Sequence, residues 1–159
     1  KYGDVEVIQP PFSMIDQRER SVLEFAKENG IGVMTYGSLG AGMLTGTIRT
    51  LPNWDPGDMR FQFYDYFKEP KFSKAQELLK VLDKVAESRN VPVAQVAVNW
   101  ITAHPLVDTA LMGVRNRHEA DENCSATSWE LTAEEIALLN EAVAEYERET
   151  PKEGSPAKR

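Results

Sequence analysis

The stretch Ile31-Gly32-Val33-Met34-Thr35-Tyr36-Gly37-Ser38-Leu39-Gly40-Ala41-Gly42-Met43-Leu44-Thr45-Gly46 decides the fold class. Its apolar first part, Gly32 to Tyr36, predicts a buried strand, and the glycines that follow predict a tight turn. In α/β folds, ligands bind beyond the carboxyl ends of parallel strands. The junction at Tyr36 is therefore where a flat ring and a phosphate are expected to bind.

A strand and a helix are predicted before this stretch. Residues 5–9 are apolar enough for a buried strand, which Pro10-Pro11 ends. Residues 17–29 carry apolar side chains at helical spacing, and Asn29-Gly30 supplies a C-terminal stop. Strand, helix and strand together predict a βαβ unit with a right-handed crossover.

The chain beyond Gly46 continues the alternation of helices and strands. Residues 47–72 contain several prolines and aromatic residues without periodicity, which predicts a long loop of the kind that is usually functional or disordered. Helices are predicted over about 73–90, from Pro92 onward and over 117–126, and a third strand over 109–113. The last helix is expected to begin at the capping box Thr132-x-x-Glu135 and to reach about residue 147.

Three strands that alternate with helices predict a parallel sheet. Alone, such a sheet leaves two exposed edges, and a complete (β/α)₈ barrel takes about 250 residues. The chain has 159 residues, opens at Lys1 without an initiator Met and reaches strand-like sequence at once. We therefore expect an α/β fold that is a partial TIM (β/α)₈ barrel, made of about the last three βα units plus a C-terminal helix, with the N-terminal half absent. Residues 1–149 would form this half-barrel, and 150–159 a disordered polar tail.

Composition excludes several classes of partner. A net charge of −7 argues against nucleic acid and anionic membranes, since both attract positively charged proteins. No apolar run is long enough to span a bilayer, and no signal peptide is visible. One cysteine and two histidines supply neither a disulfide nor a Cys- or His-based metal site. A reducing, cytoplasmic compartment is the expected location.

The ends of the predicted strands carry polar or aromatic residues. Gln9 presents an amide that can pair with a carboxamide, although it can equally cap the strand. Tyr36 is either a core aromatic residue or a stacking surface beside backbone N–H groups that bind an anion. Arg115 and Arg117 precede a helix N-terminus, which is a ready phosphate site, but isolated arginines are more often solvated surface charges.

Five motifs in sequence resemble the C-terminal half of an aldo-keto reductase. They are Val7-Ile8-Gln9, the stretch from Gly32 to Gly46, Gly57-Asp58-Met59-Arg60, Val93-Ala94-Gln95-Val96-Ala97-Val98-Asn99-Trp100, and the stretch from Gly113 to Asn123. The ending Leu131-Thr132-Ala133-Glu134-Glu135 also matches, so the resemblance covers the chain to about residue 147.

The resemblance implies a role for each matching position. Gln9 would bind the nicotinamide carboxamide and Tyr36 would stack on the ring. The pyrophosphate would be wrapped by Gly37, Ser38, Leu39, Gly40 and Ala41, with Arg60 folded over it. Gly113 and Arg115 would contact the phosphate end of the adenosine, and Glu122 with Asn123 the adenine.

Three departures from the family pattern affect this site. Gly37-Ser38 replaces the usual Ser-Pro, which removes a hydroxyl donor, and Thr47 replaces a common lysine. Glu119 replaces a Gln or Arg near the 2′-phosphate, where a carboxylate is repulsive unless Arg115 and Arg117 offset it. The resemblance implies NADP as cofactor, with NAD as the alternative.

The implied parent protein is an NAD(P)H-dependent oxidoreductase that reduces aldehydes or ketones to alcohols. The family's catalytic Asp, Tyr, Lys and His precede the first strand of this chain, so we assign no catalytic residue here and expect the chain alone to be inactive. The alternatives are a cofactor-binding regulatory subunit and a purely structural half-barrel. The expected partners are a small aldehyde or ketone and either the missing N-terminal half or an oligomer mate. The aromatic residues of 47–72 border the substrate pocket or pack onto the barrel rim.

Overall fold

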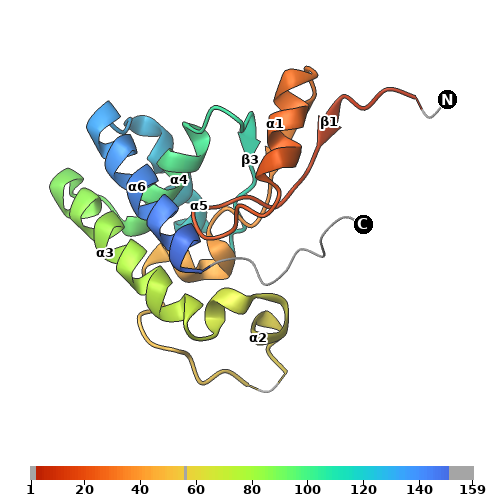
Figure 1. Cartoon of the computed structure of the whole chain (residues 1–159). Helices are drawn as coiled ribbons and strands as arrows, with labels where there is room; N and C mark the ends of the chain where they lie inside the picture. The colour runs from red at the N-terminus through yellow and green to blue at the C-terminus, as the bar shows by residue number, and fades with distance from the viewer. Residues whose placement is uncertain (1–2, 56, 151–159) are drawn as a thin grey trace.

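The computed structural model describes residues 3–55 and 57–150 (Figure 1). Its sheet contains β1 (Val7–Ile8), β2 (Gly32–Thr35) and β3 (Thr109–Ala110), which are parallel and lie in that order. Helix α1 (Arg20–Glu28) connects β1 to β2. Strands that neighbour one another in chain order are typical of a barrel, so the predicted parallel sheet and βαβ unit are confirmed.

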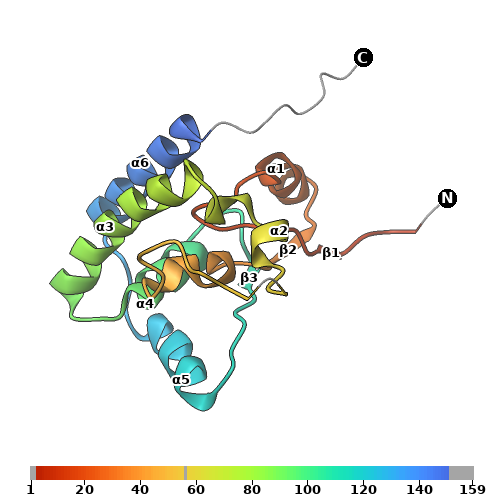
Figure 2. The ribbon, with the colours of Figure 1, turned by 90° about the horizontal axis from the view of Figure 1, so that it is seen from below.

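The remaining elements lie between β2 and β3 and after β3. The first group is η1 (Gly40–Thr45), α2 (Arg60–Phe63), η2 (Asp65–Phe67), α3 (Lys71–Arg89) and α4 (Val93–Thr102). The second is α5 (Arg117–Ser125), η3 (Ala126–Ser128) and α6 (Ala133–Glu149). Helices α3 and α6 lie side by side in both views (Figures 1 and 2).

The two faces of the sheet differ in burial. The register pairs Ile8 with Val33 and Thr35 with Ala110, and these four side chains point toward the helices and are buried or half-buried. On the opposite face Val7 is 56% exposed and Leu111 39% exposed. Successive residues of a strand point to opposite faces, so this second face also carries Met34 and the exposed Thr109 and is apolar only in part. It is the inner face of the partial barrel.

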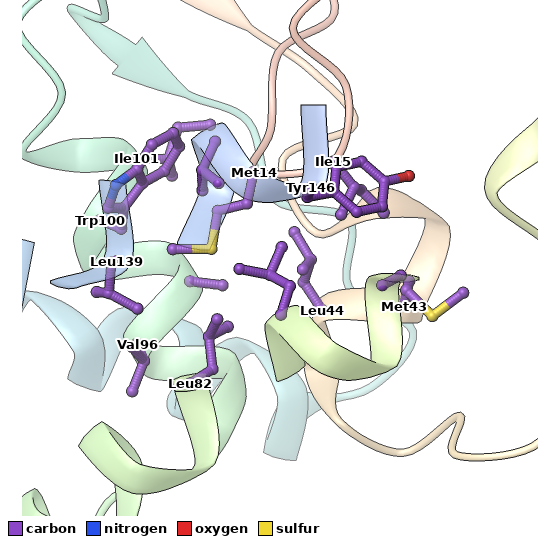
Figure 3. Packing of buried hydrophobic residues seen from close by; sticks show 14 of the residues in the cluster. Met14, Ile15, Met43, Leu44, Leu82, Val96, Trp100, Ile101, Leu139 and Tyr146 are labelled. Atoms are coloured by element: carbon purple, nitrogen blue, oxygen red, sulfur yellow. The ribbon is translucent and has the colours of Figure 1, made fainter. Parts of the chain in front are cut away.

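The core lies between the sheet and the helices and among the helices themselves. Leu82 of α3, Val96 of α4 and Leu139 of α6 are fully buried and approach one another (Figure 3). Trp100 is also buried, and its indole N–H donates to Asn140 Oδ1 at 2.8 Å. This helical layer holds the sheet from one side only.

Local sequence signals explain where the helices begin and end. Thr132 Oγ1 accepts from the Glu135 N–H at 3.2 Å, and the Glu135 carboxylate accepts from the Thr132 N–H at 2.8 Å, so the predicted capping box is confirmed. Helix α3 is followed by Asn90, which has φ +52° and adopts the left-handed conformation that terminates helices.

The structure differs from the predicted loop 47–72. Short helices α2 and η2 form inside it, and α3 begins at Lys71 rather than at residue 73. Aromatic packing supplies the reason: Trp54 lies 4.6 Å from Phe67 and 4.9 Å from Phe61 between ring centroids. Phe67 is fully buried, so these rings pack onto the core, whereas Phe63 remains 69% exposed.

The ends of the predicted elements also need adjustment. β1 and β3 are shorter than the predicted strands over 5–9 and 109–113, because each pairs with β2 alone and only over two residues. Thr150 is buried and its hydroxyl donates to the Tyr146 carbonyl at 2.6 Å. The rest of the predicted tail, 151–159, lies outside the described residues. Among the described helices, none has the length and apolar character needed to cross a membrane.

Candidate functional site

The carboxyl ends of β1 and β2 meet at one edge of the sheet. The Tyr36 N–H donates to the Pro10 carbonyl and the Phe12 N–H to the Tyr36 carbonyl, both at 3.2 Å, which extends the pairing beyond the two strands. Gln9 follows β1 and is exposed. Tyr36 is 45% exposed, so it is a surface ring rather than a core residue.

The glycine-rich turn after Tyr36 presents unused backbone donors. Gly37 has φ +68°, and the N–H groups of Gly37, Ser38 and Leu39 have no acceptor within the described residues. Left-handed backbone continues at Gly40 and Ala41, with φ +56° and +49°. Successive N–H groups in a turn of this kind form a concave anion-binding surface. The five positions predicted to wrap a pyrophosphate therefore form one turn.

Packing fixes the shape of this turn. A Cβ on Gly40 would lie 2.5 Å from Ile15 Cδ1, whereas a Cβ on Gly37 would meet nothing within 4 Å. The Ser38 hydroxyl is buried and has no partner within the part of the chain that the structure describes. Ser38 as a whole is only 2% exposed, so its hydroxyl does not reach the surface and the donor lost at Gly37 is not replaced.

Arg60 is fixed by two neighbours in the same segment. Its Nε and Nη2 donate to the Asp58 carboxylate at 3.0 and 2.6 Å, and its Cζ lies 3.7 Å from the ring centroid of Trp54. The Arg60 side chain lowers the pKa of Asp58 by hydrogen bonding to the ionised carboxylate. We call Trp54, Asp58 and Arg60 the Arg60 cluster. Asp58 belongs to the motif Gly57-Asp58-Met59-Arg60 and Trp54 to the aromatic residues of 47–72, but the sequence alone assigned neither residue a role at Arg60.

Arg115 lies just before α5 and pairs with Glu119. Arg115 Nη2 and Glu119 Oε1 are 2.6 Å apart, and the Arg115 backbone N–H donates to Oε2 of the same carboxylate at 2.8 Å. Asn116 caps α5 by accepting the Glu119 N–H at 3.0 Å. Gly113 is exposed and has open space around it. The predicted phosphate site thus contains a carboxylate of the chain itself.

The fold brings Arg60 and Arg115 into the same neighbourhood although 54 positions separate them in the sequence. Repulsion from Arg60 opposes the rise that Glu119 causes in the pKa of Arg115, so the two guanidinium groups interact electrostatically. The family resemblance alone assigned Arg60 to the pyrophosphate, whereas Arg115 was also predicted from its place before a helix N-terminus.

The predicted adenine contacts lie on α5. Glu122 and Asn123 are half-buried, as is Glu119, whereas Arg117 and His118 are exposed, with His118 Nε2 3.8 Å from Glu122 Oε2. Positions separated by three and four residues share one face of a helix. Glu119, Glu122 and Asn123 are consequently on one face.

Neither histidine lies at this edge of the sheet. His104 follows α4, before β3 begins, and its ring centroid is 4.9 Å from that of Phe12. His118 is on the exposed side of α5. Within residues 3–55 and 57–150 there is no group of three or more His, Cys, Asp or Glu side chains able to hold a metal ion.

Comparison with known proteins gives the class. Residues 1–144 match the profile of the aldo/keto reductase family. The chain belongs to this family. The chain is 34% identical over 138 residues to aldo-keto reductase YhdN of Bacillus subtilis. The aligned region covers 86% of this chain and 41% of that protein.

Two further relatives differ in the cofactor that their names give. Aldo-keto reductase yakc [NADP(+)] of Schizosaccharomyces pombe is 30% identical, over 87% of this chain and 41% of its own length. The NADH-specific methylglyoxal reductase of Escherichia coli is 26% identical, over 93% of this chain and 45% of its own length. Similarity alone therefore does not select between the two cofactors.

A solved structure confirms the fold. The glycerol dehydrogenase AKR11B4 of Gluconobacter oxydans superposes with a TM-score of 0.77 at 27% identity, covering 96% of this chain and 46% of that one. The chain thus spans less than half the length of these relatives. Its fold is part of a (β/α)₈ barrel, as the sequence predicts.

Proposed function

We propose that this chain binds a nicotinamide dinucleotide along the edge formed by the carboxyl ends of its strands. One observation carries the proposal: the N–H groups of Gly37, Ser38 and Leu39, which have no acceptor among the residues that the structure describes, directly follow the exposed ring of Tyr36. An anion-binding turn beside an exposed aromatic ring suits a pyrophosphate joined to a flat heterocycle.

The other residues extend the proposed binding edge in both directions. Gln9 binds the carboxamide of the nicotinamide, and Gly40 with Ala41 completes the pyrophosphate turn. Arg60 closes over the pyrophosphate. Gly113 and Arg115 contact the adenosine phosphate end. Glu122 and Asn123, on the half-buried face of α5, contact the adenine.

NADP is the proposed cofactor, with NAD as the alternative. Arg115 and Arg60 supply positive charge near the adenosine end, which favours a 2′-phosphate. Glu119 opposes this effect, because its carboxylate already pairs with Arg115 at 2.6 Å. The balance between these charges decides the preference.

The proposed reaction of the parent protein is the reduction of an aldehyde or ketone by hydride from the bound nicotinamide. We assign no proton donor to this chain, so its own residues bind and orient the cofactor. The alternative is a cofactor-binding subunit without catalysis. A carbonyl reduction assay on the complete protein separates the two.

Titration with NADPH and NADH tests the proposal through Tyr36. Tyr36→Ala removes the stacking ring and is expected to weaken binding about tenfold, whereas Tyr36→Phe keeps the ring and nearly all of the affinity. Phe63→Ala, at an aromatic residue that is 69% exposed elsewhere on the surface, is the matched control. Equal affinities for the unaltered chain, Tyr36→Ala and Phe63→Ala would show that Tyr36 does not contact the cofactor.

We also propose that further barrel strands cover the inner face of the sheet. Val5 and Val7 on this face are 59% and 56% exposed, and the outer edge of β1 has no neighbouring strand within the described residues. Apolar surface and an open strand edge both favour association. Isolated, the chain is expected to self-associate in light scattering; a sharp monomer peak with cooperative unfolding would contradict this.

A further inference from the structure

The guanidinium group of Arg60 lies on the ring of Trp54, and Trp54 packs against the core. Trp54, which lies under the guanidinium group, packs edge-on against Phe67 at 4.6 Å between centroids. Phe67 has no exposed surface. The position of the Trp54 ring is therefore set by core packing and not by the loop alone.

Trp54 lies against the flat face of the Arg60 guanidinium, and Asp58 fixes how the group is turned within its own plane. Its carboxylate accepts from Nε and Nη2 of Arg60 and also from the Arg60 backbone N–H at 3.0 Å. The Nη1 group of Arg60 has no acceptor within the described part of the chain. Asp58 thus occupies one edge of the guanidinium and leaves the other edge for a ligand.

We propose that Asp58 and Trp54 are positioning residues that preorganise Arg60 for the cofactor pyrophosphate; this inference rests on the proposed function. A flexible arginine loses side-chain entropy when it binds a phosphate, and a fixed one loses less. Asp58 also weakens the attraction of Arg60 for an anion. The side chains of Asp58 and Arg60 are 22% and 38% exposed, so water screens the effect of the Asp58 charge on a bound anion. The gain from holding Arg60 in a fixed orientation is then larger than the loss of attraction.

The first test measures the Arg60 geometry without any cofactor. In NMR spectra the Arg60 Nε–H is expected to exchange with water at least about tenfold more slowly than that of Arg117, whose bond to Asp121 is 3.4 Å long and exposed. Asp58→Ala should bring the Arg60 exchange rate to the Arg117 value. Equal rates for Arg60 and Arg117 in the unaltered chain would overturn the inference.

The second test measures cofactor binding by calorimetry with NADPH and NADH. Arg60→Ala is expected to weaken binding about tenfold and Asp58→Ala about fivefold. Because Asp58 acts only through Arg60, the double variant should bind no more weakly than Arg60→Ala. Asp58→Asn retains one acceptor oxygen and should recover part of the affinity.

Asp83→Ala is the matched control, because Asp83 forms a similar pair with Arg49, with hydrogen bonds of 2.7 and 2.9 Å. It should leave binding unchanged. Unchanged or tighter binding by Asp58→Ala, or additive losses in the double variant, would overturn the positioning role while leaving the proposed function intact. No binding of NADPH or NADH by the unaltered chain would instead contradict the proposed function, and with it the role of Asp58 in binding.

Discussion

Glu119 accepts two hydrogen bonds from Arg115, one on each carboxylate oxygen: the backbone N–H donates to Oε2 at 2.8 Å and Nη2 of the guanidinium to Oε1 at 2.6 Å. Hydrogen bonding to Arg115 lowers the pKa of Glu119, so this carboxylate is ionised at neutral pH. It therefore places a negative charge at the N-terminal turn of α5, where the free helix N–H groups favour an anion.

Glu119→Gln is expected to raise the affinity for NADP more than that for NAD. The substitution removes a negative charge near the 2′-phosphate and leaves Arg115 free to bind it; the expected gain for NADP is about threefold to tenfold. Fluorescence titration with both cofactors measures the change. Asp121→Asn, which alters the exposed pair with Arg117, is the control. Equal gains for NADP and NAD would contradict this role of Glu119.

Gly40→Ala is expected to destabilise the chain by about 3 kcal/mol, because the residue has φ +56° and its new Cβ would overlap Ile15. Gly37→Ala should cost only about 1 kcal/mol, since the same left-handed backbone there has open space. Urea unfolding compares the two. Ile15→Val removes the Cδ1 atom and should recover part of the loss in the Gly40→Ala background; equal costs at Gly37 and Gly40 would exclude the steric explanation.

Asn99→Ala is expected to cost about 2–4 kcal/mol of stability. The buried amide of Asn99 donates to the carbonyls of Ala126 and Trp129, at 3.0 and 2.6 Å, and accepts the Leu131 N–H at 3.2 Å. Truncation leaves these backbone groups without partners and loosens the connection between α5 and α6. Asn29→Ala, which removes only an exposed amide hydrogen bond to the Phe25 carbonyl, should cost about 1 kcal/mol or less, and thermal unfolding of both variants checks the difference.

Stability is expected to fall as the pH drops from about 6.5 toward 4, in part because of His104. Burial, with a smaller effect of Arg20, lowers the pKa of His104 from 6.5 to about 4. Over this interval the unfolded chain takes up a proton that the folded chain excludes, so the unfolded state is favoured. Glu24 and Glu147 line the cavity beside His104 and do not reverse this direction.

His104→Phe tests this, because a phenyl ring can occupy the site between Phe12 and Trp100. The free energy of unfolding of the variant, measured by urea denaturation at several pH values, should depend less steeply on pH than that of the unaltered chain. His118→Asn, at an exposed residue, should keep the original slope. The same slope for the unaltered chain and His104→Phe would contradict the prediction.

Much of the fold was predictable because its signals are local. Helix α6 begins at Thr132 as its capping box requires, and the alternation of helices and strands predicted the parallel sheet. The segment 47–72 was not predictable, since α2 and η2 form there only where Trp54, Phe61 and Phe67 pack on one another. That packing depends on a buried surface supplied by other parts of the chain.

The sequence by itself determined where along the chain the three strands lie and which glycines follow β2, since strand patterning and glycine turns are short-range features. Tertiary structure alone decided that Tyr36 is exposed, that the Ser38 hydroxyl is buried, and that Arg60 lies close enough to Arg115 to oppose the rise in its pKa. The physical reason is that burial and electrostatic interaction depend on distances between segments. Those distances are set by how the helices pack on one face of the sheet.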